Sequence, residues 1–174
     1  MAFKLHVLTA AASLALVLTS VAEAQRYGAP AAGLDPTALS RDTQRINTGQ
    51  YQSGMTAIAN KNFENAENIF EEILRQKIGD ADASFYAGVA EMSLGKWEEA
   101  RAHLEVAAKK KPKEPDPKSR LGITLAKLGD TAGAMEQRAA LEKMDKDCKG
   151  TCKNAQFIAG GIAMIDSALP MPTP

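Results

Sequence analysis

The stretch DASFYAGVAEMSLGKWEEARAHLEVAAKKKP, residues 82–112, decides the fold. Its apolar residues recur at helical spacing on either side of Leu94-Gly95-Lys96, which predicts two helices joined by a tight turn. Gly95 can adopt the positive φ that ends a helix without steric cost. Such a hairpin has two apolar faces and nothing beside it to cover them. We therefore expect further hairpins to pack against it.

The same pattern recurs with a period of 34 residues. Two columns of small residues keep this step, namely Gly54, Gly88 and Gly122, and Ala66, Ala100 and Ala134. Small residues in the first helix, an alanine in the second and a closing proline, Pro112, resemble the tetratricopeptide repeat. The resemblance covers about residues 47–146. It implies an all-α, right-handed solenoid of three helix-turn-helix repeats, at residues 47–80, 81–114 and 115–146.

The N-terminal segment predicts export. Lys4, an apolar run over residues 5–20 and the small-x-small sequence Ala22-Glu23-Ala24 are typical of a secretory signal peptide at residues 1–24, cleaved after Ala24. The product would then be periplasmic or secreted. Residues 25–46 are expected to form a flexible leader with a short helix at 36–45, which can continue towards Tyr51.

Beyond residue 146 the period slips by five residues. Gly122 and Gly161 lie 39 residues apart, and the five-residue sequence Cys148-Lys-Gly-Thr-Cys152 accounts for the difference. We expect a cysteine loop at residues 147–153 and a helix at 154–169 that caps the last repeat, since a solenoid must cover its final apolar face. A disordered tail at residues 170–174 completes the chain.

Cys148 and Cys152 are the only cysteines, and they allow three interpretations. An oxidising compartment favours an intramolecular disulfide that holds the capping helix in place. A thiol-redox or copper-handling role is the second. The thioredoxin-like copper proteins with this spacing use an additional histidine, whereas the one histidine after residue 24 is His103, far from both cysteines in sequence. Intermolecular pairing is the third.

The composition argues against several functional classes. Twenty-one basic and 21 acidic residues, with 5% aromatic residues, leave no electrostatic footprint for nucleic acid or an anionic membrane. No Gly-x-Ser-x-Gly elbow, histidine pair or phosphate-binding glycine loop is present. We therefore expect no enzymatic activity, no cofactor and no metal.

In tetratricopeptide proteins the first helices of successive repeats line a concave groove in which ligands usually bind. The resemblance places ten residues there: Tyr51, Met55, Ile58, Asp82, Phe85, Val89, Met92, Ser119, Ile123 and Lys127. This surface is largely apolar and lacks the lysine/arginine–asparagine clamp of family members that bind carboxylate ends. It suits an apolar peptide or an amphipathic helix, because methionine adapts to irregular partners.

These features together predict a protein-interaction module of the bacterial cell envelope that binds another protein. The groove can instead be covered from within by the helix at residues 36–45, or by a second copy of the chain. Two alternative functions therefore stay open. One is a self-assembling structural protein, and the other is a thiol-redox or copper-handling protein.

Overall fold

The computed structural model describes residues 36–170, with side chains from residue 48 onwards. The predicted signal peptide, the first part of the leader and residues 171–174 of the tail lie outside the described residues. The chain divides into two compact units, residues 1–41 and 42–174, and apart from residues 36–41, which begin the first described helix, the following description concerns the second.

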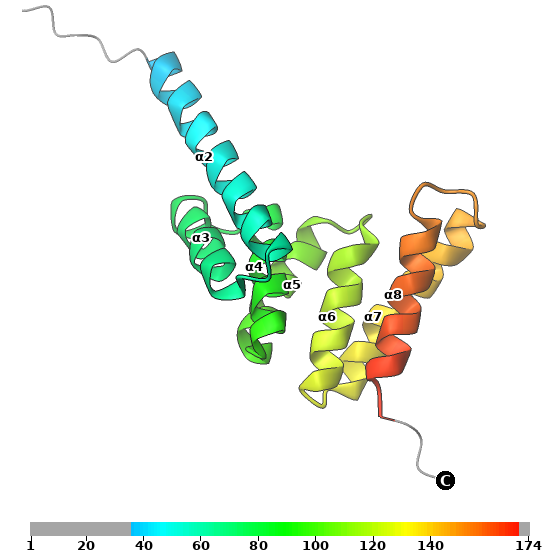
Figure 1. Cartoon of the computed structure of the whole chain (residues 1–174). Coiled ribbons are helices and arrows are strands. Elements are labelled where there is room, and N and C mark those ends of the chain that lie inside the picture. The colour runs from blue at the N-terminus through cyan, green and yellow to red at the C-terminus, as the bar shows by residue number, and fades with distance from the viewer. Residues whose placement is uncertain (1–35, 171–174) are drawn as a thin grey trace, which may run out of the picture. The chain divides into compact units, whose positions relative to one another are not determined.

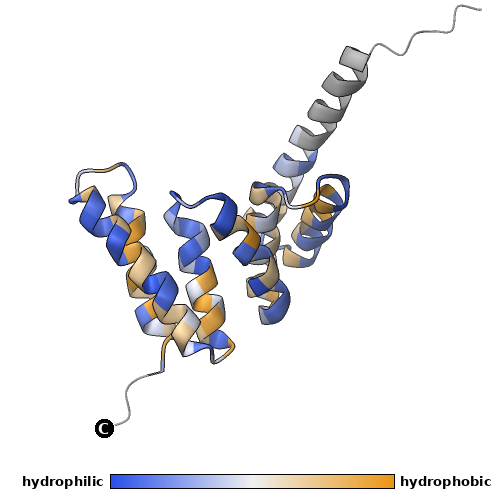
Figure 2. Cartoon of the chain, turned by 180° about the vertical axis from the view of Figure 1, so that it is seen from behind, coloured by the Kyte–Doolittle hydropathy of each residue, from blue (hydrophilic) through white to orange (hydrophobic). Residues whose placement is uncertain are grey.

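All regular structure within residues 36–170 is α-helical (Figure 1). The helices are α2 (Pro36–Ala59), α3 (Phe63–Gln76), α4 (Ala81–Leu94), α5 (Trp97–Lys110), α6 (Pro115–Lys127), α7 (Thr131–Cys148) and α8 (Ala155–Ala168). None of these described helices has the length and apolar character needed to cross a membrane. Helices α3 to α8 each carry both hydrophilic and hydrophobic residues (Figure 2).

The 34-residue period of the sequence is the spacing of the helices. The second helices of the repeats, α3, α5 and α7, begin at Phe63, Trp97 and Thr131. The first helices α4 and α6 begin at Ala81 and Pro115, with the same step. Each helix packs against the next along the chain from α3 to α8, and α6 also packs against α8.

The turn predicted at Gly95 is confirmed. Gly95 has φ of 75°, in the left-handed region, and its N–H donates to the carbonyls of Glu91 and Met92 at the end of α4. At the other end of this helix, Asp80 Oδ1 accepts from the backbone N–H groups of Asp82 and Ala83, at 3.1 and 3.0 Å. An aspartate at this position satisfies donors that the first turn leaves free.

Two helix boundaries differ from those expected. Helix α2 is continuous from Pro36 to Ala59, so the helix expected at residues 36–45, which could continue towards Tyr51, joins the repeat helix expected from residue 47. Residues 37–48 contain neither glycine nor proline to interrupt it. Helix α7 continues to Cys148, so the first cysteine ends a helix, and Lys149 with φ of 52° follows it.

The buried side chains form two clusters. The first is built by α2, α3 and α4 around Phe70 and Ile73. The second is built by α5 to α8 around Leu104, Leu141, Ile158 and Ile165. The alanine column Ala66, Ala100 and Ala134 is fully buried, which lets the helices approach closely.

Candidate functional site

The centre of the predicted binding surface is an apolar strip on two consecutive first helices. Phe85 and Met92 of α4 and Ile123 of α6 are half-buried, and all three pack against the cluster built by α5 to α8. Val89, also half-buried, lies one turn from Phe85 on the same helix. The Phe85 ring meets Tyr86 edge-on, with centroids 5.2 Å apart. The core thus fixes these side chains while part of each stays accessible.

The three residues of α2 that were predicted to bind a partner differ in how far they are buried. Tyr51 and Ile58 pack against the α2–α4 cluster, and Met55 is 41% exposed. The Tyr51 ring lies edge-on to Phe70 at 5.9 Å, and its hydroxyl donates to Asp80. Burial, helped by the contact with Asp80, holds the pKa of Tyr51 well above its ordinary value. Tyr51 therefore links α2 to the start of α4 and has little freedom to bind a partner.

Asp80 both caps the start of α4 and accepts the hydrogen bond from the Tyr51 hydroxyl. Burial alone would raise the pKa of Asp80, but hydrogen bonds from Lys77 and Tyr51 outweigh it and lower the pKa to about 2. The Asp80 carboxylate is thus charged throughout the physiological range. It holds the first repeat against the second.

The polar members of the predicted set have three different environments. Lys127 is exposed, and Asp82 is exposed and paired with Lys111 at the end of α5. Ser119 is only 1% exposed, because α8 packs over it at Gly161. Its Oγ has no hydrogen-bond partner among the described residues. Ser119 therefore presents nothing to a partner.

A charged network that the sequence reasoning missed lies between the first and second repeats. Glu91 of α4 is 2% exposed, and both of its carboxylate oxygens lie 2.9 Å from Nδ1 of His103 on α5. On the other side of the ring, Nε2 lies 3.3 Å from Glu71 of α3. The hydrogen bond with Glu91 raises the pKa of His103, with help from the charge of Glu71, although burial opposes it.

This arrangement favours an imidazolium that joins three consecutive helices. The three side chains bring their ligand atoms within 4.8 Å of one another, a spacing that a metal ion could also use. However, Nδ1 of His103 is hydrogen-bonded to Glu91 and Nε2 lies at ion-pair distance from Glu71, so a protonated ring can serve both carboxylates without a metal ion. One sequence signal was available. Glu91 lies three and four residues after Gly88 and Ala87, on the buried face of its helix.

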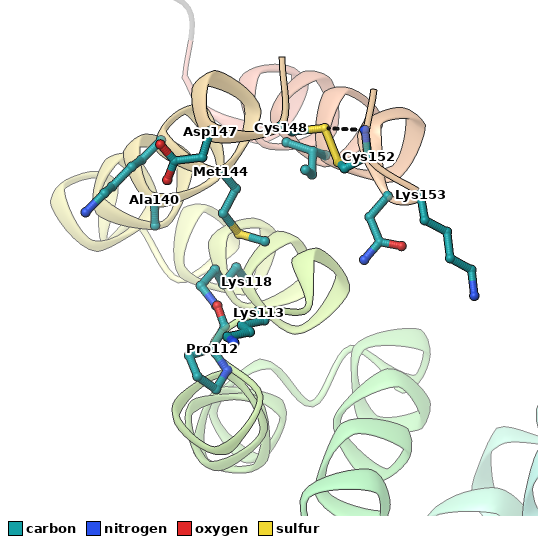
Figure 3. Close-up of a pocket in the computed structure, with 12 residues that line it drawn as sticks. Pro112, Lys113, Lys118, Ala140, Met144, Asp147, Cys148, Cys152 and Lys153 are labelled. Carbon is teal, nitrogen blue, oxygen red and sulfur yellow. Dashed lines mark hydrogen bonds between the residues drawn. A yellow bond between two sulfur atoms is a disulfide. The ribbon is translucent and has the colours of Figure 1, made fainter. Parts of the chain in front are cut away.

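A pocket of about 620 Å³ lies away from the predicted binding surface (Figure 3). It is lined by the start of α6, the end of α7 and residues 152–154, which lead into α8. None of the ten predicted residues lines it. Its lining includes one acidic residue, Asp147, and four lysines: Lys113, Lys118, Lys143 and Lys153. Burial lowers the pKa of Lys118, whose Nζ donates to the carbonyl of Pro112 at 2.6 Å.

Cys148 and Cys152 form one wall of this pocket and are joined in a disulfide, with Cα atoms 5.2 Å apart (Figure 3). The N–H of Cys152 lies 3.3 Å from Sγ of Cys148. The bond closes the turn between the last residue of α7 and the segment that leads into α8.

Comparison with known proteins gives a family match over part of the chain. Residues 51–115 match the family model described as tetratricopeptide repeat. Residues 51–115 of this chain are therefore similar to tetratricopeptide repeats. A comparison with curated proteins finds no match.

Solved structures of tetratricopeptide proteins have the same fold. The TPR2B domain of yeast Sti1 in complex with pHsp70 is 19% identical, covers 69% of this chain and 95% of that one, and superposes with a TM-score of 0.58. PcrH in complex with the chaperone binding region of PopD is 20% identical, with coverages of 78% and 94% and a TM-score of 0.60. The Sgt2 domain from Aspergillus fumigatus is 21% identical, with coverages of 73% and 86% and a TM-score of 0.56. These likenesses confirm the all-α tetratricopeptide solenoid expected from the sequence.

Proposed function

We propose that this protein is a non-enzymatic interaction module that binds an apolar peptide or an amphipathic helix of another protein. The binding surface would be formed by the first helices α2, α4 and α6. The observation that carries the proposal is the apolar strip of Phe85, Met92 and Ile123, half-buried on a common core and free of charge. Fixed apolar side chains bind with little loss of conformational entropy.

The solved complexes support the same class of partner. The Sti1 domain is titled as a complex with pHsp70, and PcrH as a complex with the chaperone binding region of PopD. Each therefore binds part of another protein. In our chain the apolar character of the strip favours an apolar ligand, since burial of such surface drives association.

The test is capture of a partner from an envelope fraction, followed by titration of the identified segment into the purified chain. Phe85→Glu places a charge in the strip and should abolish binding. Because Phe85 also packs against the core, Met55→Glu provides a second variant at a residue that is 41% exposed. Met135→Glu, at a 47% exposed methionine on α7 outside the surface, is the matched control. Equal binding by all three variants would contradict the proposal.

We also propose that the protein works in the periplasm or is secreted. The proposal depends on the signal-peptide pattern of residues 1–24. Mass spectrometry of the chain recovered from a Gram-negative periplasmic fraction should give a product that begins at Gln25. Recovery of the uncleaved chain in the cytosol would refute it.

We infer a structural role for Cys148–Cys152, as opposed to thiol-redox or copper chemistry. The bond ties the end of α7 to the segment before α8, and no histidine is present among the residues that line the adjoining pocket. Replacement of both cysteines by serine should leave partner binding unchanged. Loss of binding while the helix content is retained would favour a functional role for the pair.

A further inference from the structure

The outer side of α8 is an apolar strip with no described helix over it. Its inner side, with Ile158 and Ile165, is buried in the cluster built by α5 to α8. On the outer side Phe157 is 55% exposed and Met164 is 40% exposed, with the exposed Gly160 between them. We call Phe157, Gly160 and Met164 the α8 outer strip. The helix expected to shield the solenoid therefore leaves apolar surface of its own.

The repeat pattern explains why this strip is bare. The step of 39 residues that relates Gly122 to Gly161 also relates Leu121 and Leu125 of α6 to Gly160 and Met164 of α8. Leu121 and Leu125 are 5% and 4% exposed, because α7 packs on α6.

Helix α8 therefore corresponds to the first helix of a fourth repeat. Within residues 36–170 no second helix follows to cover its corresponding face. A Cβ at Gly160 would have nothing within 4 Å, whereas its counterparts in the two preceding repeats, Ala87 and Leu121, are 0% and 5% exposed.

The strip has two properties that suit contact with an identical surface. First, it is uncharged. The only charged residue of α8 is Asp166, which is paired with Arg138 of α7, so two copies of the strip would not repel each other. Charge is typically depleted at the centres of interfaces. Second, the strip is nearly symmetric about Gly160, with Phe157 three residues before it and Met164 four residues after it.

We propose that the α8 outer strip is the contact surface of a homodimer, in which two α8 helices pack antiparallel about a two-fold axis at Gly160. This arrangement places Phe157 of each copy beside Met164 of the other, a favourable sulfur–aromatic contact. The glycines at the centre let the two backbones approach closely. A two-fold contact of this kind uses the same surface on both copies. It is separate from the partner-binding surface on α2, α4 and α6 and does not depend on it.

The dimer is expected to be weak, because one helix from each copy buries less than the roughly 1,200 Å² of a stable interface. Sedimentation of the purified chain from micromolar to millimolar concentration should show a monomer–dimer equilibrium. Phe157→Glu should weaken dimerisation by about tenfold or more, the effect of losing one well-packed contact. Met135→Glu, at a methionine of α7 that is 47% exposed, should leave dimerisation unchanged. A chain that stays monomeric throughout, or equal dimerisation of the two variants, would overturn the proposal.

A charge-complementation experiment tests the antiparallel arrangement itself. Met164→Lys alone should also weaken dimerisation, and circular dichroism should show native helix content for both strip variants because their positions are exposed. An equimolar mixture of the Phe157→Glu and Met164→Lys chains should then dimerise more tightly than either alone, since the new carboxylate faces the new ammonium. A mixture that dimerises no better than the separate variants would refute this geometry.

Discussion

Replacing His103 with leucine is expected to destabilise the protein strongly, because it leaves the Glu91 carboxylate buried without its cation. Glu91 is 2% exposed, and the His103 side chain is 23% exposed. Breaking a fully buried pair costs about 3–5 kcal/mol, and the partial exposure of His103 lets water reduce this to about 3 kcal/mol. Urea unfolding followed by circular dichroism measures the change, with Trp97 fluorescence as a second probe.

A double-mutant cycle separates this charge effect from lost packing. When Glu91 and His103 are both replaced by leucine, most of the stability should return, because apolar groups that replace a buried pair are often neutral or stabilising. The double variant should therefore be more stable than His103→Leu alone. If His103→Leu costs less than about 1 kcal/mol, or if the double variant is no more stable than the single one, our account of the network is refuted.

The same pair makes stability depend on pH. Since the pKa of His103 in the folded protein lies above its ordinary value of 6.5, the folded state holds the proton more tightly than the unfolded state. The contribution is complete below pH 6.5 and is lost as the pH rises through the higher, folded value. Glu67, Glu71 and Glu91 are the carboxylates that favour this proton. The wild-type chain should thus lose stability over this interval, and His103→Leu should show a smaller loss.

Three further stability changes follow from the packing. Gly88→Ala should destabilise the protein by about 1 kcal/mol, because overpacking against Leu104, 2.7 Å from the new Cβ, outweighs the gain in helix propensity. Gly160→Ala should stabilise it by up to about 1 kcal/mol, because the new Cβ meets nothing within 4 Å. Equal effects of the two variants in urea unfolding would contradict this reasoning. Ser119→Ala should raise the unfolding free energy by about 1 kcal/mol, because it removes an unpaired buried hydroxyl; a loss of stability would reveal a missed hydrogen bond. Reducing Cys148–Cys152 should cost about 2 kcal/mol by loop entropy, measured as a lower thermal midpoint; no shift would refute that estimate.

The sequence alone determined the repeat and the helix order. The glycine and alanine columns predicted a 34-residue step, and the starts of α3, α5 and α7 are separated by this step. These features are predictable because each repeat must bury small residues between its own two helices, which is a local requirement that recurs with the period. The assignment of Phe85, Met92 and Ile123 to one binding surface came from the resemblance to tetratricopeptide proteins and stays a prediction.

The tertiary structure decided which helices pack against one another. This packing determines features of the protein that the 34-residue period does not predict. The spacing from Ala87 and Gly88 places Glu91 on the buried face of its helix, but only the structure shows that His103 of the next helix pairs with it. Ser119 matches the column of a binding surface, but α8 covers it. The α8 outer strip is bare although its counterpart on α6 is buried. Burial depends on whether another helix lies over a position, and the spacing of residues along one chain does not specify that.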